Sequence, residues 1–284
     1  MMNNLKTAAL LAAMGGLIMA LGAMLGGRSG LTIGLIMGLV MVAGSYWFSD
    51  KLAIASARAR PVSAQEFPQY HATVANLAQR ANIPMPRLYV APNPQPNAFA
   101  TGRNPANAAV CINEGLMQYL TWEEISGVLA HEIAHVRNRD ILTSSVAAAI
   151  AMGITFTARM AMWGAMFSGG GRSDDRDGGG IGALFMVILA PIAASVIQMA
   201  VSRSREYEAD ASAARLLGTG EPLACALEKL EIGAQRIPAE VNEAQAQAYI
   251  VNPLRGGAQS LARMFSTHPS TADRISRLRD QSWR

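Results

Sequence analysis

The sequence contains little cysteine, histidine, aromatic side chain or charge. Its 284 residues include 2 Cys and 4 His, while 15% are charged and 6% aromatic. Cys111 and Cys225 show no Cys-x-x-Cys spacing, which argues against a disulfide framework and against a cysteine-based zinc site. A hydrophobic fraction of 51% and a mean hydropathy of +0.19 are too high for an ordinary soluble enzyme. Residence in a membrane is therefore the first inference.

The apolar residues are concentrated in four runs. Each run has the ~20 residues that a helix needs to cross a bilayer core. We therefore expect four transmembrane helices in two hairpins, at 5–26, 31–49, 141–167 and 181–201. A cleaved signal peptide is the alternative for the first run, and a hairpin buried within the protein is the alternative for the third. The chain therefore divides into an N-terminal hairpin at 1–50, a segment between the hairpins at 51–140, a second hairpin at 141–202 and a C-terminal segment at 203–284.

Basic residues indicate the orientation of these helices. The net charge of +4 and the pI of 9.3 do not predict nucleic-acid binding, because Lys and Arg occur singly or in small groups without interleaved aromatics. They fit a topology signal instead. Basic side chains follow the second run at Lys51, Arg58 and Arg60, and follow the fourth at Arg203 and Arg205. The positive-inside rule places both of these segments in the cytoplasm, beside the lipid bilayer.

One motif in the sequence indicates chemistry. His131, Glu132 and His135 form His-Glu-x-x-His inside a pattern that predicts a helix over 121–138, with a capping box in Thr121-Trp122-Glu123-Glu124. Two His residues four apart lie on one helix face, where both imidazoles can bind one zinc ion. Glu132 then lies beside the metal, where it can accept a proton from bound water.

The segments around this motif predict a small α+β unit. Helical spacing marks 66–82, and His71 within it is predicted to be a surface or packing residue rather than a ligand. Short strands are predicted at 87–90, 97–101 and 108–112. An edge strand beside a metal helix can hold an extended peptide by main-chain hydrogen bonds. A purely structural hairpin is the alternative for the same residues.

A catalytic zinc site usually has a third protein ligand from another segment. Glu206 and Asp210 lie four apart on a helix predicted to end at Gly218. They share a face, so one can bind the metal while the other supports a ligating imidazole. Glu208 points elsewhere. A hairpin formed by the last two apolar runs would return residue 206 to the end of the metal helix.

Three segments together resemble the HtpX family of membrane-bound zinc endopeptidases, which are relatives of the CAAX prenyl endopeptidases. These segments are Asn97-Ala98-Phe99-Ala100-Thr101-Gly102, His131-Glu132-Ile133-Ala134-His135 and Ser202-Arg203-Ser204-Arg205-Glu206-Tyr207-Glu208-Ala209-Asp210. The resemblance implies that one Zn²⁺ is bound by His131, His135 and Glu206, with Glu132 as general base. It also implies that Asp210 orients a ligand and that Asn97 lies in the substrate-binding strand. His268, followed by Pro269 and Arg274, resembles the family's C-terminal segment and is expected near the oxyanion, although Pro269 and 270–273 equally suit a helix start.

The resemblance further implies a fold and a biological role. The expected fold is a mainly α membrane protein with a small β-sheet, in which a zincin-like, gluzincin-type catalytic domain in the cytoplasm joins four transmembrane helices. This domain is expected to form from two catalytic halves, one at 51–140 with the edge strands and the metal helix, and one at 203–284 with the third metal ligand. The expected role is quality control at the inner membrane, with unfolded or membrane proteins as substrates and a functional link to the membrane AAA+ protease. Three alternatives stay open: a zinc-binding membrane protein without catalysis, a transporter or structural membrane protein in which the motif is incidental, and a site-2-type intramembrane metalloprotease. The last is disfavoured by Arg137-Asn138-Arg139-Asp140, which follow the motif and require water.

Overall fold

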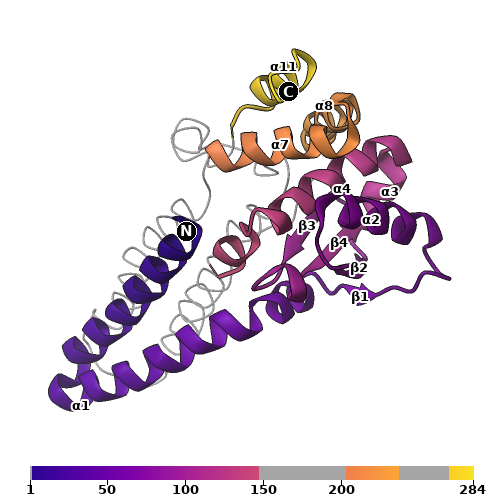
Figure 1. Cartoon of the computed structure of the whole chain (residues 1–284). Helices are drawn as coiled ribbons and strands as arrows, with labels where there is room; N and C mark the ends of the chain where they lie inside the picture. The colour runs from indigo at the N-terminus through magenta and orange to yellow at the C-terminus, as the bar shows by residue number, and fades with distance from the viewer. Residues whose placement is uncertain (1, 147–202, 237–268) are drawn as a thin grey trace.

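The computed structural model describes residues 2–146, 203–236 and 269–284. Residues 147–167 of the span predicted at 141–167, the whole span predicted at 181–201 and the residue His268 lie outside this part of the chain. Within it, the protein is mainly helical and contains one small mixed β-sheet. Helices from both sides of the gap between 146 and 203 pack against the metal helix and share one hydrophobic core with the sheet (Figure 1).

The longest element is helix α1, Met2–Ser56. It runs out from the N-terminus, reverses and returns toward the sheet, so that it forms two arms (Figure 1). Gly27 lies between the arms with a φ of +57°, a backbone conformation that glycine adopts without steric cost. Gly15 and Gly38 bring the arms together, because a Cβ on Gly38 would lie 3.4 Å from the Gly15 Cα. Of the described residues, the window Gly27–Gly44 is apolar and long enough to cross a membrane, and only 6% of it is buried in the protein.

The sheet has the strand order β1-β2-β4-β3. Strand β1 (Arg60–Pro61) pairs antiparallel with β2 (Arg87–Ala91), β2 pairs parallel with β4 (Ala109–Asn113), and β4 pairs antiparallel with β3 (Ala98–Thr101). The three predicted strands are confirmed within one residue at each end. The two-residue strand β1 was not predicted, because a pair of residues carries no alternation pattern. Strand β3 lies at the edge of the sheet, next to α4 (Figure 1).

The metal helix α4 spans Trp122–Arg137. The predicted capping box is present: the Thr121 hydroxyl accepts from the Glu124 amide, and the Glu124 carboxylate accepts from the Thr121 amide. Helix α2 (Pro68–Ala81) also agrees with its prediction and packs against α4. Between β3 and β4 lies a short 3₁₀ helix, Pro105–Asn107, and the short helix α3 (Glu114–Tyr119) leads from β4 toward α4.

The C-terminal helices complete the core around α4. Helices α7 (Arg203–Leu217) and α8 (Glu221–Arg236) pack on α4, and α11 (Thr271–Arg279) packs on α7 and α8. Gly127 of α4 allows the close approach of α8, since a Cβ at this position would lie 2.5 Å from the Leu223 backbone nitrogen. The same buried cluster therefore contains residues from both predicted catalytic halves, including Val110, Ile133 and Leu227.

Candidate metal centre

The two motif histidines lie on one face of α4 and point at the same position. Their Nε2 atoms are 3.1 Å apart, and the two rings meet edge to face with centroids separated by 4.6 Å. His131 is 1% exposed, while His135 is partly exposed. The helix period therefore has the effect predicted from the sequence, because it directs two imidazole nitrogens at one point.

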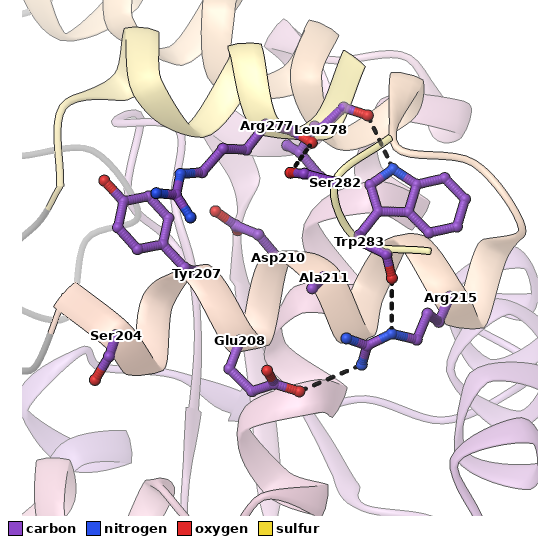
Figure 2. A pocket seen from close by; sticks show the side chains of 10 residues that line it. All are labelled: Ser204, Tyr207, Glu208, Asp210, Ala211, Arg215, Arg277, Leu278, Ser282 and Trp283. Carbon is purple, nitrogen blue, oxygen red and sulfur yellow. Dashed lines mark hydrogen bonds and ion pairs between the residues drawn. The ribbon is translucent and has the colours of Figure 1, made fainter. Parts of the chain in front are cut away.

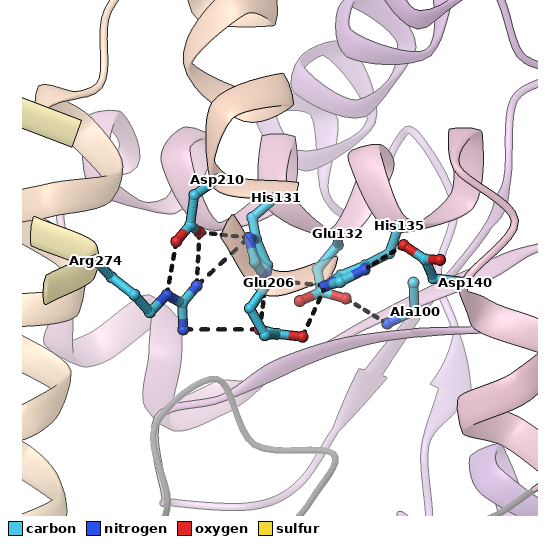
Figure 3. A network of polar contacts seen from close by, with 8 residues as sticks. All are labelled: Ala100, His131, Glu132, His135, Asp140, Glu206, Asp210 and Arg274. Carbon is cyan, nitrogen blue, oxygen red and sulfur yellow. Dashed lines mark hydrogen bonds and ion pairs between the residues drawn. The ribbon is translucent and has the colours of Figure 1, made fainter. Parts of the chain in front are cut away.

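Glu206 reaches this point from α7. Its Oε2 lies 3.7 Å from Nε2 of His131, and its Oε1 lies 3.6 Å from Nε2 of His135. The ligand atoms of all three residues lie within 4.8 Å of one another (Figure 3). Among the residues that the structure describes, no other group of His, Cys, Asp or Glu has this geometry.

The donor set fits a metal ion of the zinc type. Zn–N bonds of about 2.0–2.1 Å in tetrahedral geometry place two ligand nitrogens roughly 3.3 Å apart. The separation of 3.1 Å between the imidazole nitrogens is near this value. Two imidazoles and one carboxylate leave the fourth position for water, as in catalytic zinc sites with two His and one Glu.

Asp210 and Arg274 hold His131 from the side away from the metal position. Asp210 Oδ1 lies 2.9 Å from the Nδ1 atom of His131, and Arg274 donates to both oxygens of Asp210 over 2.7 and 2.8 Å. Burial acts to raise the pKa of Asp210, but the charge and hydrogen bonds of Arg274 outweigh it and lower this pKa to about 2. Arg274 is 1% exposed, and its Nη1 lies 3.9 Å from Glu206. One buried guanidinium thus contacts the carboxylates of both α7 residues.

Glu132 lies beside the metal position, and the sheet holds one of its carboxylate oxygens. Its Oε2 accepts a hydrogen bond from the Ala100 amide of edge strand β3 over 2.7 Å (Figure 3). Burial raises the pKa of Glu132, although the neighbouring imidazoles and the Ala100 amide act in the opposite direction. A carboxylate with a raised pKa is suited to accept and return a proton near neutral pH.

Comparison with known proteins agrees with this geometry. The family model of peptidase family M48 matches residues 64–282, which is about three quarters of the chain. The chain belongs to peptidase family M48. Relatives with the name Protease HtpX homolog include those of Syntrophobacter fumaroxidans and Pelotomaculum thermopropionicum. The first is 51% identical over 98% of this chain and 99% of its own length, and the second is 50% identical over 98% of each.

A solved structure shows the same fold as this M48 peptidase. The crystal structure of Ste24p from S. mikatae has a TM-score of 0.52 to this chain at 20% identity. The similarity covers 98% of this chain and 65% of the Ste24p chain, so the M48 peptidase spans about two thirds of its structural neighbour. The family model and the HtpX relatives show that the chain is a metalloprotease, with the motif helix in the matched segment.

One buried carboxylate in the site was not predicted from the M48 peptidase's sequence. Asp140 follows the metal helix and is 4% exposed, and its Oδ2 lies 3.3 Å from Nδ1 of His135. Burial lowers the pKa of His135, but the hydrogen bond to Asp140 and the charges of Glu206 and Glu132 outweigh this effect and raise it to about 9. Asp140 lies five positions after His135, whereas side chains on one helix face lie three or four positions apart. The spacing in the sequence therefore did not indicate this contact.

The remaining candidate residues lie in different places. Asn97 is buried and directly precedes β3, and its carbonyl accepts from the Asn113 amide over 2.9 Å. His71 lies away from the metal position, where its Nε2 contacts the Val62 carbonyl at 3.0 Å. Glu208 points away from the metal, as predicted, and pairs with Arg215.

A cavity of about 310 Å³ lies between α7 and α11 of the M48 peptidase (Figure 2). The Arg277 guanidinium lies 4.0 Å from the centre of the Tyr207 ring, and Arg215 donates to the Trp283 carbonyl over 2.9 Å. Asp210 is one of its lining residues, whereas His131, His135 and Glu206 do not line it. The cavity therefore belongs to the contact between α7 and α11 rather than to the metal centre.

Proposed function

We propose that this M48 metalloprotease is a zinc-dependent endopeptidase of the inner membrane that cleaves misfolded or damaged membrane proteins on the cytoplasmic side. The observation that carries the proposal is the convergence of His131, His135 and Glu206 above the buried carboxylate of Glu132. This arrangement joins a metal site with one open position to a proton acceptor. A site that only stores metal requires no such acceptor.

Zinc is the metal that best fits the donor set of two imidazoles and one carboxylate. A bound zinc ion supplies Lewis-acid chemistry, because it polarises a peptide carbonyl and lowers the pKa of a bound water to ~7. The chain's own residues orient the metal ligands and move the protons. Asp210 accepts a hydrogen bond from the Nδ1–H group of His131, which keeps the proton on Nδ1 and leaves the Nε2 lone pair free for the metal.

Glu132 is proposed as the general base and then the general acid. Its raised pKa allows it to take a proton from the attacking water and to pass that proton to the leaving amine. The hydrogen bond from Ala100 fixes one carboxylate oxygen, so the other oxygen is available for this transfer. Burial excludes bulk water from the carboxylate, which strengthens its electrostatic interactions.

Strand β3 is proposed to bind the substrate. It lies at the edge of the sheet, and an extended peptide can add to such an edge by main-chain hydrogen bonds, which favours unfolded substrates of varied sequence. Asn97 at the start of this strand is proposed to contact the peptide. We also propose that His268 approaches the oxyanion, since Pro269 and Ser270 lead directly into α11, the helix of Arg274.

The membrane part of the proposal rests on sequence together with helix α1. The apolar window Gly27–Gly44 supports an anchor, and Lys51, Arg58 and Arg60 after it support a cytoplasmic catalytic domain. The apolar runs at 141–167 and 181–201 support two further spans, which makes four with the arms of α1. We also propose a functional link with the membrane AAA+ protease, which the resemblance to the HtpX family implies.

A substitution of the general base tests the proposal. Purified Glu132→Gln should bind one zinc per chain with nearly the same affinity as the unsubstituted protein, yet its cleavage of unfolded casein should fall by at least about 10²-fold. His135→Ala should lose both zinc and cleavage. Zinc content is measured by atomic absorption, and a chelator abolishes cleavage by the unsubstituted protein. Retained proteolysis in Glu132→Gln would overturn the assignment.

A further inference from the structure

His135 contacts a carboxylate that no part of the proposed mechanism has yet used. Its Nε2 atom points toward His131 and Glu206, while Asp140 Oδ2 lies 3.3 Å from its Nδ1. Asp140 is buried. The contact repeats, on the other histidine, the contact of 2.9 Å between His131 Nδ1 and Asp210 (Figure 3). Each histidine therefore has one nitrogen at the metal position and the other at a buried carboxylate.

The end of α4 brings Asp140 to this position. The Asp140 amide donates to the His135 carbonyl over 3.0 Å, and the Arg139 amide donates to the Val136 carbonyl over 3.2 Å. With Asn138 as C-cap and Arg139 in the left-handed region at a φ of +58°, these two bonds form a Schellman motif. The motif commonly places an apolar contact between the residues that here are His135 and Asp140. In this chain, a carboxylate and an imidazole occupy those positions.

Helix α4 is followed by a residue other than glycine, Arg139, in the left-handed conformation. Glycine is the usual residue there, and an L-residue costs roughly 1 kcal/mol in this conformation. Arg139 adopts the left-handed conformation despite this cost. Strained backbone of this kind persists where the surrounding structure requires it, which is often at a functional site.

A buried cation lies close to the same carboxylate. Arg205 precedes Glu206 on α7, and its Nη1 and Nη2 atoms are buried without a hydrogen-bond partner in the part of the chain that the structure describes. Burial lowers the pKa of Arg205, and the charges of Asp140 and Glu206 oppose that effect. Arg205 thus acts on Asp140 through its positive charge, without the direct hydrogen bonds by which Arg274 holds Asp210.

We propose that Asp140 is a positioning residue of the metal centre that holds His135 as Asp210 holds His131. The inference rests on the proposed zinc-dependent function. Asp140 accepts a hydrogen bond from the Nδ1–H group of His135, which fixes the ring and leaves Nε2 as the lone-pair donor to the metal. Arg205 balances the charge of Asp140 next to the ligand Glu206. Both imidazoles are then set in orientation before the metal binds.

The test compares Asp140→Ala and Asp140→Asn with Arg137→Ala in the full chain purified in detergent. Arg137 is exposed in the last turn of α4 and provides the matched control. Zinc affinity is measured by competition with a chelator, and imidazole geometry by the visible spectrum of the cobalt-substituted protein. Asp140→Ala should weaken zinc binding by about 10- to 100-fold and alter the cobalt spectrum. Asp140→Asn keeps an acceptor oxygen and should fall between Asp140→Ala and the unsubstituted protein, and Arg137→Ala should match the latter.

Unchanged zinc affinity with an unchanged cobalt spectrum in both Asp140 variants would overturn the inference while leaving the proposed function intact. If Asp140→Ala does not fold, Asp140→Asn decides the question, because its side chain has the same size and its loss of charge must still weaken zinc binding. Failure of the unsubstituted protein to bind one zinc per chain would instead overturn the proposed function and this inference with it.

Discussion

The carboxylate of Glu132 is held by the backbone amide of Ala100 over 2.7 Å. This hydrogen bond joins the metal helix to the edge strand of the sheet, so the proposed general base and the proposed peptide-binding strand form one unit. Displacement of β3 would displace the base as well. The position of the base is therefore determined by the sheet and not by α4 alone.

We predict that Ala100→Pro lowers the turnover number by about 10- to 100-fold, because proline lacks the amide hydrogen and leaves one Glu132 oxygen free to move. Since the Ala100 amide faces Glu132, proline at this position removes no hydrogen bond between β3 and β4. Ala100→Gly keeps the amide and is the control. Steady-state kinetics with an unfolded protein substrate measures both variants, and full turnover in Ala100→Pro would contradict the prediction.

Arg274→Met should destabilise the protein by about 3–5 kcal/mol, because it leaves the buried carboxylate of Asp210 without its cation. Arg274→Lys should recover part of the loss, since an ammonium keeps the charge but not the two-pronged geometry. Arg279→Met removes an exposed arginine of the same helix and should destabilise the protein far less than Arg274→Met, because solvent screens exposed ion pairs. Chemical denaturation measures all three variants.

The double variant Arg274→Met/Asp210→Asn provides a further check. If the arginine acts through Asp210, this double variant should be less destabilised than the sum of the two single variants. Simple addition of the two effects would show that Arg274 stabilises the fold by a different route.

Zinc affinity should rise about tenfold per pH unit between pH 7 and 9 and level off above that range. The pKa of His135 is raised to about 9 in the metal-free site, so below this value the ring carries a proton that zinc must displace. An ordinary histidine, with a pKa of about 6.5, would give a flat profile above pH 7. Chelator competition at several pH values distinguishes the two cases, and an affinity that does not change from pH 7 to 9 would contradict the prediction.

Local sequence signals predicted much of the fold. The capping box at Thr121 and the apolar stripe behind it gave the metal helix within one residue at each end, and Gly218 ended α7 as predicted. These features depend on residues a few positions apart, so a short segment contains all the residues that determine them. The order of the strands and the parallel pairing of β2 with β4 were not predicted, because they depend on packing between distant segments.

The same difference between local and long-range contacts determined which residues of the metal centre were predicted. The spacing of His131 and His135 indicated the site, and the pair Glu206 and Asp210 was found by its helical spacing. Asp140 was missed because a Schellman motif, rather than a helical repeat, brings it to His135. The contact of Arg274 with Asp210 was missed because 64 residues separate the two in sequence.

The metal centre joins parts of the chain that are made at different times. The Nδ1 of His131 and the guanidinium of Arg274 meet at Asp210, although 143 residues separate them in sequence. A nascent chain therefore carries the His-Glu-x-x-His helix long before it carries the carboxylate of α7 or the arginine of α11. The chain must extend at least to Glu206 before its three metal-binding side chains can meet, and the arginine that holds Asp210 follows only with α11.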